Sequence, residues 1–401
     1  MNAQTKTDAF EPIIRGVAQS GVRMANERAV LSLIGGVPGV SNADVARRTG
    51  LGPQTTARIL LDLEERGLIE RGEVLRGKRG QPATPYWLNP NGAFAFGVEI
   101  GWSHLEIVLK PMVGDPLARI RLPHDFFDPH NVLERIAAEI RAMQAQLTDA
   151  QRDRLNVIGI AMPGFLPQMA ELLAESPERA GAWDRIDIGA RLAASTGLEV
   201  TGFNDGSAAT WTHIVAAPVP RPPGFASFQI GTFIAGGVIS EGAVWHGPSG
   251  HGADLGSIMV TDFAGKTTPL HCVSSLFALQ GRLKEAGIPV SGEPDSWDTP
   301  AIGRVFEAWL DEAGFALAQA AISASAMMDI DLFIIDGVLP GEGLARLTEQ
   351  VRLHLARLPN PSRGLPEIVR GDFGATAPAL GAAQLTLFDR YFSRGWTLFR
   401  S

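Results

Sequence analysis

The sequence contains very little cysteine. Cys272 is the single cysteine among 401 residues, which excludes an internal disulfide framework and any metal site built from several cysteines. No run of about 18 apolar residues occurs, so we expect no membrane-spanning helix. The segment MNAQTKTDAFEPIIRG (1–16) has no apolar core of signal-peptide length. Together these absences favour a cytoplasmic protein, because thiols stay reduced in that compartment.

Charge is unevenly distributed along the chain. The formal net charge is −8, yet residues 1–89 carry 12 Lys and Arg against 9 Asp and Glu, which leaves −11 for the remainder. A chain of 401 residues is long enough for two or three domains. The mildly basic amino-terminal part and the acidic remainder therefore indicate different partners, although so small an excess is weak evidence for nucleic acid on its own.

Helical patterns dominate the first 67 residues. NERAVLSLI (26–34) has apolar residues at helical spacing, and SNADVARRTG (41–50) begins with a capping box and ends at a glycine. LGPQTTARILLDLEERG (51–67) has a proline in its first turn. The residues that we expect this last helix to bury are Ala57, Leu60, Leu61 and Leu63. The order of the helices and the short glycine-containing turn form a helix-turn-helix candidate.

A basic hairpin is expected next. LIERGEVL (68–75) and TPYWLNP (84–90) have strand patterns, and RGKRGQPA (76–83) lies between them. Cations at such a tip are typical of a wing that contacts phosphate or the minor groove. Gln and Arg at the start of the third helix can form bidentate hydrogen bonds to base edges in the major groove.

These features predict a winged helix-turn-helix domain over residues 15–88 that binds operator DNA. The alternative is a small helical docking module with solvated charges. The candidate DNA-contacting residues are Arg47, Arg48, Gln54, Thr55, Thr56, Arg58, Arg76, Lys78 and Arg79.

Strand and helix patterns alternate beyond residue 92. AFAFGVEIG (93–101), NVIGIAMPG (156–164) and DLFIIDGV (331–338) are expected as strands. NVLERIAAEIRAMQAQL (131–147) and AWLDEAGFALAQAAISASAMM (308–328) are expected as helices. This alternation indicates an α/β fold, and its two β-rich stretches would begin two lobes.

Several motifs resemble the ROK family of repressors, open reading frames and sugar kinases. The matching stretches are NERAVLSLI, LEERGLIE, RGQPATPYWLNP, GIAMPG, FNDGSAAT, GHGADLGSIMV and ALGAAQL. Their order and spacing from about Arg23 to Phe388 carry the resemblance, which is greatest to the repressor branch, such as the xylose and N-acetylglucosamine repressors. It implies an actin-like or hexokinase-like pair of α/β lobes over residues 93–390. In that family sugar binds between the lobes, kinase members also bind ATP there, and chains associate through this region.

The loops that handle phosphate in the kinase relatives are altered here. The family loop D-x-G-G-T-K corresponds to EIGWSH (99–104), with Trp102 at the second glycine and His104 at the lysine. A second glycine-rich loop corresponds to GTFIAGG, where Phe233 replaces a glycine, and at a third Asp336 is expected to add negative charge where a nucleotide would approach. Bulky side chains prevent the close backbone approach that glycine allows. Since phosphoryl transfer depends on positioning, we expect no kinase activity and no cofactor.

The zinc motif of the family is also incomplete. The histidine that follows E-I-G in relatives corresponds to Ser257, and of three family cysteines only Cys272 could remain. Tetrahedral zinc needs about four nitrogen or sulfur ligands. We therefore expect no metal and interpret Cys272 as a small buried residue.

The sugar side of the motif is better preserved. Asn204 and Asp205 match the family's N-D pair. In kinase members this aspartate is the base for the attacking hydroxyl, and without a phosphate donor it would instead accept a hydrogen bond from a ligand hydroxyl. A helix cap is the alternative role for both residues.

Further ligand contacts are implied by the resemblance. Gly164 would let the backbone approach the sugar or would only form a turn, and His251 would reach the ligand or be a satisfied loop histidine. Asp254 stands at the place of a sugar-contacting glutamate, and Ser257 and Ser274 replace other polar family residues. The candidate ligand-binding residues are Gly164, Asn204, Asp205, His251, Asp254 and Ser257.

The sequence thus predicts a transcriptional regulator, a repressor, that senses a small carbohydrate through a catalytically inactive sugar-kinase-like region. Because palindromic DNA offers two half-sites, a homodimer or homotetramer is expected. Two alternatives remain: a bifunctional ATP-dependent sugar kinase with a DNA-binding domain, and a regulator whose second region only dimerises.

Overall fold

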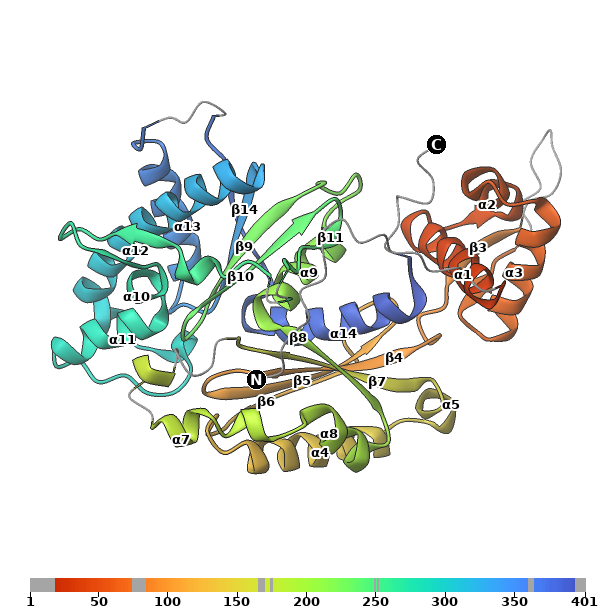
Figure 1. Ribbon diagram of the computed structural model, residues 1–401, viewed down its shortest axis with the longest axis horizontal. Coiled ribbons are helices and arrows are strands. Elements are labelled where there is room, and N and C mark those ends of the chain that lie inside the picture. Colours follow the sequence, from red (N-terminus) through yellow and green to blue (C-terminus); the bar gives the residue numbers. More distant parts are fainter. Residues whose placement is uncertain are drawn as a thin grey trace. The chain divides into compact units, whose positions relative to one another are not determined.

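The computed structural model describes residues 19–73, 84–164, 170–173, 176–248, 250, 252–359 and 364–393. The chain divides into two compact units (Figure 1). We call the described residues up to Asn89 together with Tyr391–Ser393 the head, and Pro90–Arg390 the body. Among the residues described, no helix combines the length and the apolar character that crossing a bilayer requires.

The head is a three-helix domain with a small sheet. Its elements are α1 (Gln19–Gly36), β1 (Val40–Ser41), α2 (Asn42–Thr49), α3 (Pro53–Glu65), β2 (Ile69–Arg71) and β3 (Pro85–Leu88). The three strands pair antiparallel in the order β1-β3-β2. Ser41 begins α2 with the expected capping box, in which its hydroxyl accepts from the backbone N–H of Asp44 and the Asp44 carboxylate accepts from the backbone N–H of Ser41. This arrangement confirms the winged helix-turn-helix fold.

The buried face of α3 differs from the expected one. Its buried residues are Thr56, Ile59, Leu60 and Leu63. Ala57 is exposed and Leu61 is 51% exposed. The observed set follows the helical spacing i, i+3, i+4, i+7. The prediction of the buried face was wrong because this face begins with the polar residue Thr56.

The body contains two five-stranded sheets with the same layout. The first has the order β6-β5-β4-β7-β8 and the second the order β11-β10-β9-β14-β15. In each sheet an antiparallel meander of three strands continues into two parallel strands. The strands are β4 (Phe94–Ile100), β5 (His104–Pro111), β6 (Ala118–Pro123), β7 (Leu155–Met162), β8 (Glu199–Asn204), β9 (Phe225–Ile230), β10 (Ile234–Ser240), β11 (Ala243–Val244), β14 (Leu332–Gly337) and β15 (Glu367–Arg370). The repeated layout confirms an α/β body with two lobes.

Helices cover the two sheets. The first lobe carries α4 (Pro129–Ala145), α5 (Asp149–Arg152), α7 (Pro177–Ala180) and α8 (Ile188–Thr196). The second carries α10 (His271–Ser274), α11 (Leu276–Glu285), α12 (Thr299–Met328), α13 (Gly343–Leu355) and the short hairpin β12 (Met259–Thr261) and β13 (Thr267–Pro269). Two further helices, α9 (Asp205–Ala216) and α14 (Ala377–Tyr391), lie between the sheets (Figure 1).

Glycines allow the central helices to touch both sheets. A Cβ atom at Gly97 of β4 would lie 1.9 Å from the carbonyl oxygen of Ala379 in α14. One at Gly381 of α14 would lie 1.7 Å from the carbonyl oxygen of Ala208 in α9, and one at Gly206 of α9 would lie 2.1 Å from a carbonyl oxygen of β10. Real Cβ atoms do not approach so closely, so only glycine fits at these positions. Backbone contact therefore runs from one sheet through α14 and α9 to the other.

Candidate functional site

The start of α3 is open to solvent. Gln54 and Arg58 are exposed and Thr55 is half-buried. On α2, Arg47 and Arg48 are exposed, and Arg47 forms an ion pair with a carboxylate of its own helix. Within the part of the chain that the structure describes, neither Arg48 nor Arg58 has an acidic partner. These two cations are therefore available to a phosphate backbone.

Three further cations of the head are neutralised within the fold. Arg23 and Arg66 form ion pairs with Glu27 and Asp62 that tie α1 to α3, with nitrogen–oxygen distances from 2.7 to 3.2 Å. Arg71 pairs with a glutamate of α3. Unpaired positive charge is thus found on α2 and at the start of α3, where contact with DNA was expected.

Thr56 is removed from the candidate DNA contacts. Its side chain is fully buried, and its hydroxyl donates to Oδ1 of Asn42 at 2.6 Å. A buried hydroxyl that joins α2 to α3 cannot reach a base edge, so the prediction for this residue was wrong. Arg76, Lys78 and Arg79 lie outside the described residues, and their role at the wing tip stays a prediction.

In the body, Asn204 and Asp205 lie where β8 ends and α9 begins. Asn204 caps the helix, because its Oδ1 accepts from the backbone N–H of Ser207 at 3.0 Å. Oδ1 of Asp205 accepts from the backbone N–H of Gly206 at 2.8 Å and from Nδ2 of Asn204 at 3.1 Å. Oδ2 of Asp205 has no hydrogen-bond partner among the described residues. Asn204 thus has the capping role that was the alternative for both residues.

The charges of two other carboxyl groups act on Asp205. Burial raises the pKa of Asp205 to about 7, against the lowering effect of the Gly206 N–H, and the charges of Glu99 and Asp254 raise this pKa further. Glu99 is 8% exposed, and its Oε2 lies 3.2 Å from Nε2 of His104. At neutral pH a good part of the Asp205 carboxyl groups is therefore protonated and can donate as well as accept a hydrogen bond.

The other candidate ligand residues are less constrained. Asp254 and Ser257 are exposed at the 3₁₀ turn Leu255–Ser257, and Gly164 is half-buried after β7. Ser274 is buried and its hydroxyl donates to the carbonyl of Ala313 at 3.1 Å, so this side chain has a structural role. His251 lies outside the described residues.

Aromatic side chains meet at two turns that the sequence analysis compared with glycine-rich loops. Trp102, in the β4–β5 turn, contacts Phe233, in the β9–β10 turn, edge to face with ring centroids 5.4 Å apart. Trp102 also lies 4.6 Å from the ring of Phe126, and Phe233 lies 5.4 Å from that of Phe277. The β4–β5 turn of the first lobe and the β9–β10 turn of the second lobe are therefore in contact through these two rings.

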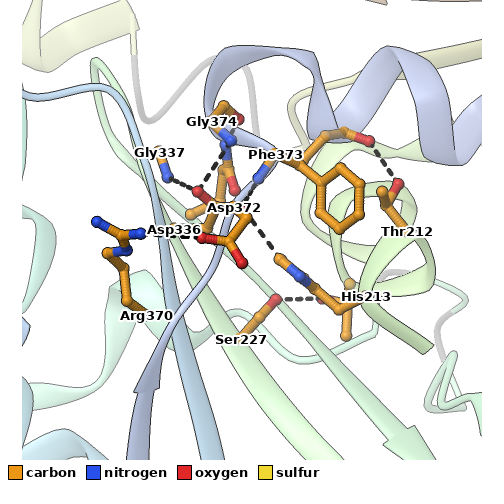
Figure 2. Close-up of polar contacts among 12 residues, drawn as sticks. Thr212, His213, Ser227, Asp336, Gly337, Arg370, Asp372, Phe373 and Gly374 are labelled. Atoms are coloured by element: carbon orange, nitrogen blue, oxygen red, sulfur yellow. Dashed lines mark hydrogen bonds and ion pairs between the residues drawn. The ribbon is translucent and has the colours of Figure 1, made fainter. Parts of the chain in front are cut away.

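The third altered position is not as expected. Asp336, at the end of β14, is fully buried. Its Oδ1 accepts from the backbone N–H groups of Gly337 at 2.8 Å and Gly374 at 2.9 Å, and its Oδ2 accepts from that of Phe373 at 3.0 Å (Figure 2). The prediction that Asp336 offers negative charge to an approaching nucleotide was wrong, because its carboxylate is enclosed by the chain itself.

Comparison of the sequence with models of protein families shows the family of this chain. Residues 95–388 match the ROK family, and residues 21–80 match the MarR family. The chain belongs to the ROK family. Uncharacterized protein y4fQ of Sinorhizobium fredii is 28% identical over 373 residues, which is 92% of each chain.

Solved ROK structures share the fold. A ROK family transcriptional regulator, a homolog of the E. coli MLC protein, has a TM-score of 0.67 at 20% identity and covers 92% of this chain and 98% of its own. A ROK family glucokinase from Streptomyces griseus, in complex with glucose and AMPPNP, has a TM-score of 0.56 at 18% identity and covers 73% of this chain and 99% of its own. The ROK fold therefore occurs in both regulators and kinases.

The ROK body shows no metal centre among its described residues, where no three His, Cys, Asp or Glu side chains are arranged to hold an ion. Cys272 is half-buried rather than buried, and burial raises the pKa of its thiol. The pairing of Glu99 with His104 and the meeting of Trp102 with Phe233 were missed by sequence reasoning. The first pair lies across the single turn between β4 and β5, whereas the second joins turns of different lobes that only the folded body brings together.

Proposed function

We propose that this ROK protein is a DNA-binding transcriptional repressor whose body recognises a small carbohydrate without transferring a phosphoryl group. The observation that carries the DNA-binding part is the exposed start of α3, where Gln54 and Arg58 project from a winged helix head. A helix of this kind fits the major groove, and both residue types make bidentate contacts with bases. The ROK regulator that shares 92% of this chain's length supports the same function.

Genomic selection tests this function. Purified full-length protein is mixed with fragments of the genome that encodes it, at physiological salt, and the bound fragments are sequenced. The proposal expects enrichment of a few sites with two related half-sites, because a homodimer presents two heads. Uniform, weak binding of all fragments would contradict it, since non-specific binding needs only phosphate contacts.

The body is proposed to hold a sugar against Asp205. Oδ2 of this carboxyl is unused, and its raised pKa lets it exchange hydrogen bonds with a hydroxyl in either direction. Glu99 and Asp254 supply further acceptors nearby. Since Trp102 and Phe233 bring bulky rings together at two turns that would need glycines to approach phosphates, the site is proposed to bind rather than to catalyse.

The chain offers a direct route from the body to the head. The helix α14 contacts the first sheet and α9, and it ends at Tyr391 in the head. Two residues later the backbone N–H of Ser393 donates to the hydroxyl of Ser32 in α1 at 2.9 Å. We propose that the two lobes adopt more than one arrangement and that a sugar binds one arrangement more tightly than another. Binding would then shift the position of α14 and so change the DNA affinity of the head.

Replacing Asp205 with asparagine should stabilise the protein at neutral pH. The pKa of Asp205 is about 7 in the folded state and 3.8 ordinarily, so the folded chain holds a proton that the unfolded chain releases. The contribution of Asp205 to wild-type stability therefore falls as pH rises from about 4 to about 7, by up to about 1.4 kcal/mol per pH unit. The asparagine side chain does not titrate and lacks this loss, so urea unfolding should show a larger gain for Asp205→Asn at pH 8 than at pH 5.

A second variant tests whether the gain comes from the raised pKa of Asp205. Glu99→Gln removes one of the charges that raise the pKa of Asp205. In the Glu99→Gln background the gain from Asp205→Asn should be smaller at pH 8. The same gain at pH 5 and pH 8 in the wild-type background would contradict the raised pKa.

A further inference from the structure

The carboxylate of Asp336 lies in a pocket of backbone donors. The N–H groups of Phe373 and Gly374 are consecutive in the turn before α14, and the N–H of Gly337 comes from the end of β14 (Figure 2). All three point at one carboxyl group over distances of 2.8 to 3.0 Å. Consecutive N–H groups directed at one point form a nest, which is a general binding site for anions.

Glycines shape this nest for close approach. Gly374 has φ of +55° and Gly337 has φ of +128°, both in the region that disfavours side chains. A Cβ atom at Gly371 would lie 2.6 Å from the carboxylate carbon and one oxygen of Asp336. Residues with a Cβ atom at these three positions would keep the backbone farther from the carboxylate of Asp336.

Within the described chain, no cationic side chain neutralises Asp336. The basic side chain beside it is His213 of α9, whose Nε2 lies 3.4 Å from Oδ2 of Asp336. Burial lowers the pKa of His213 to about 4, so its ring is neutral at physiological pH. Arg370 pairs instead with Asp372 at 3.1 Å. Burial raises the pKa of Asp336, and the three backbone N–H groups oppose that rise. The negative charge of Asp336 is therefore held by backbone dipoles.

We propose that Asp336 is a built-in anion that occupies an anion-binding site formed by Gly337, Phe373 and Gly374. The site would accept a carboxylate or phosphate from solution if the side chain were absent. With Asp336 in this site, its hydrogen bonds hold β14 to the turn before α14. An external phosphate cannot bind there, because the carboxylate of Asp336 already occupies the site. This inference stands on the geometry of the nest and holds whether or not the body recognises a sugar.

Anion rescue of Asp336→Gly tests the inference. The variant removes the carboxylate and keeps the three donors, so its thermal midpoint in sodium chloride should fall well below that of the wild type. Replacing chloride with sodium formate at constant ionic strength should restore at least half of the loss, because formate supplies the missing carboxylate. Inorganic phosphate in place of formate shows whether the site also admits a tetrahedral anion, and rescue by either anion supports the proposal.

Two controls separate rescue from a general salt effect. The first control is the wild type, and the second is Leu347→Ala, which destabilises the body because Leu347 of α13 is fully buried. For both proteins, the change in thermal midpoint from chloride to formate should be the same, because neither has an empty anion site. If Asp336→Gly does not fold in chloride, refolding yield replaces the midpoint, and recovery in formate or phosphate supports the proposal. Equal behaviour of Asp336→Gly and Leu347→Ala in all three salts would overturn it.

Discussion

Replacing Gly97 with alanine is expected to prevent the body from folding. The added Cβ would lie 1.9 Å from the carbonyl oxygen of Ala379 and 2.9 Å from the backbone nitrogen of Ala383. Both atoms belong to the backbone of α14, which cannot move aside as a flexible side chain could. Overpacking of a core usually costs about 1–3 kcal/mol. A backbone clash of this size should exceed that and consume much of a total stability of about 5–15 kcal/mol.

Gly202 provides a matched control in the same sheet. It lies on β8, and a Cβ atom there would meet nothing within 4 Å. Soluble yield and cooperative unfolding followed by circular dichroism should be lost for Gly97→Ala and retained for Gly202→Ala. A Gly97→Ala variant as stable as wild type would show that α14 does not pack against β4 as described.

The double variant Gln54→Ala, Arg58→Ala should lose specific DNA binding. Each good bidentate contact with a base is worth about 1–3 kcal/mol, so removing two should lower affinity for a selected site by roughly 30-fold or more. Both side chains are exposed, and folding of the head should be unaffected. Fluorescence anisotropy with a labelled site at fixed salt measures the change.

Glu65→Ala is the control for this variant. Glu65 is exposed at the last residue of α3, far along the helix from Gln54. Its removal should leave affinity unchanged or slightly higher, because it takes away a negative charge. If the double variant binds the selected site as tightly as Glu65→Ala does, α3 is not the element that reads DNA.

Elements with strong local patterns were predictable from the sequence. The strands β4, β7 and β14 begin and end within two residues of the expected segments, because strands buried on both faces are continuous apolar runs. The long helix α12 begins at Thr299, nine residues before the expected start, because Pro300 and Gly303 in its first turns are weak helix formers and obscure the helical pattern. Local patterns therefore located these buried strands and the later turns of α12 but not the first turns of this helix, although Ile302 and Phe306 are buried there.

The candidate site was predictable only in part. Asn204 and Asp205 were found because the end of a strand and the start of a helix can be read locally. The contact between Trp102 and Phe233 joins turns that are far apart in the sequence, so no local pattern reveals it. For Asp336 the sequence shows a charge and gives no sign of the backbone donors that surround it.

The most direct test of recognition without phosphoryl transfer is ADP formation from ATP. Full-length protein is incubated with ATP and glucose, N-acetylglucosamine or xylose, and the Streptomyces griseus glucokinase serves as positive control. Because the rings of Trp102 and Phe233 meet at two turns where phosphate binding would require glycines, we predict the same rate with and without each sugar. ADP formation that depends on a sugar, scales with protein and disappears in Asp205→Asn would contradict a body that binds without catalysing.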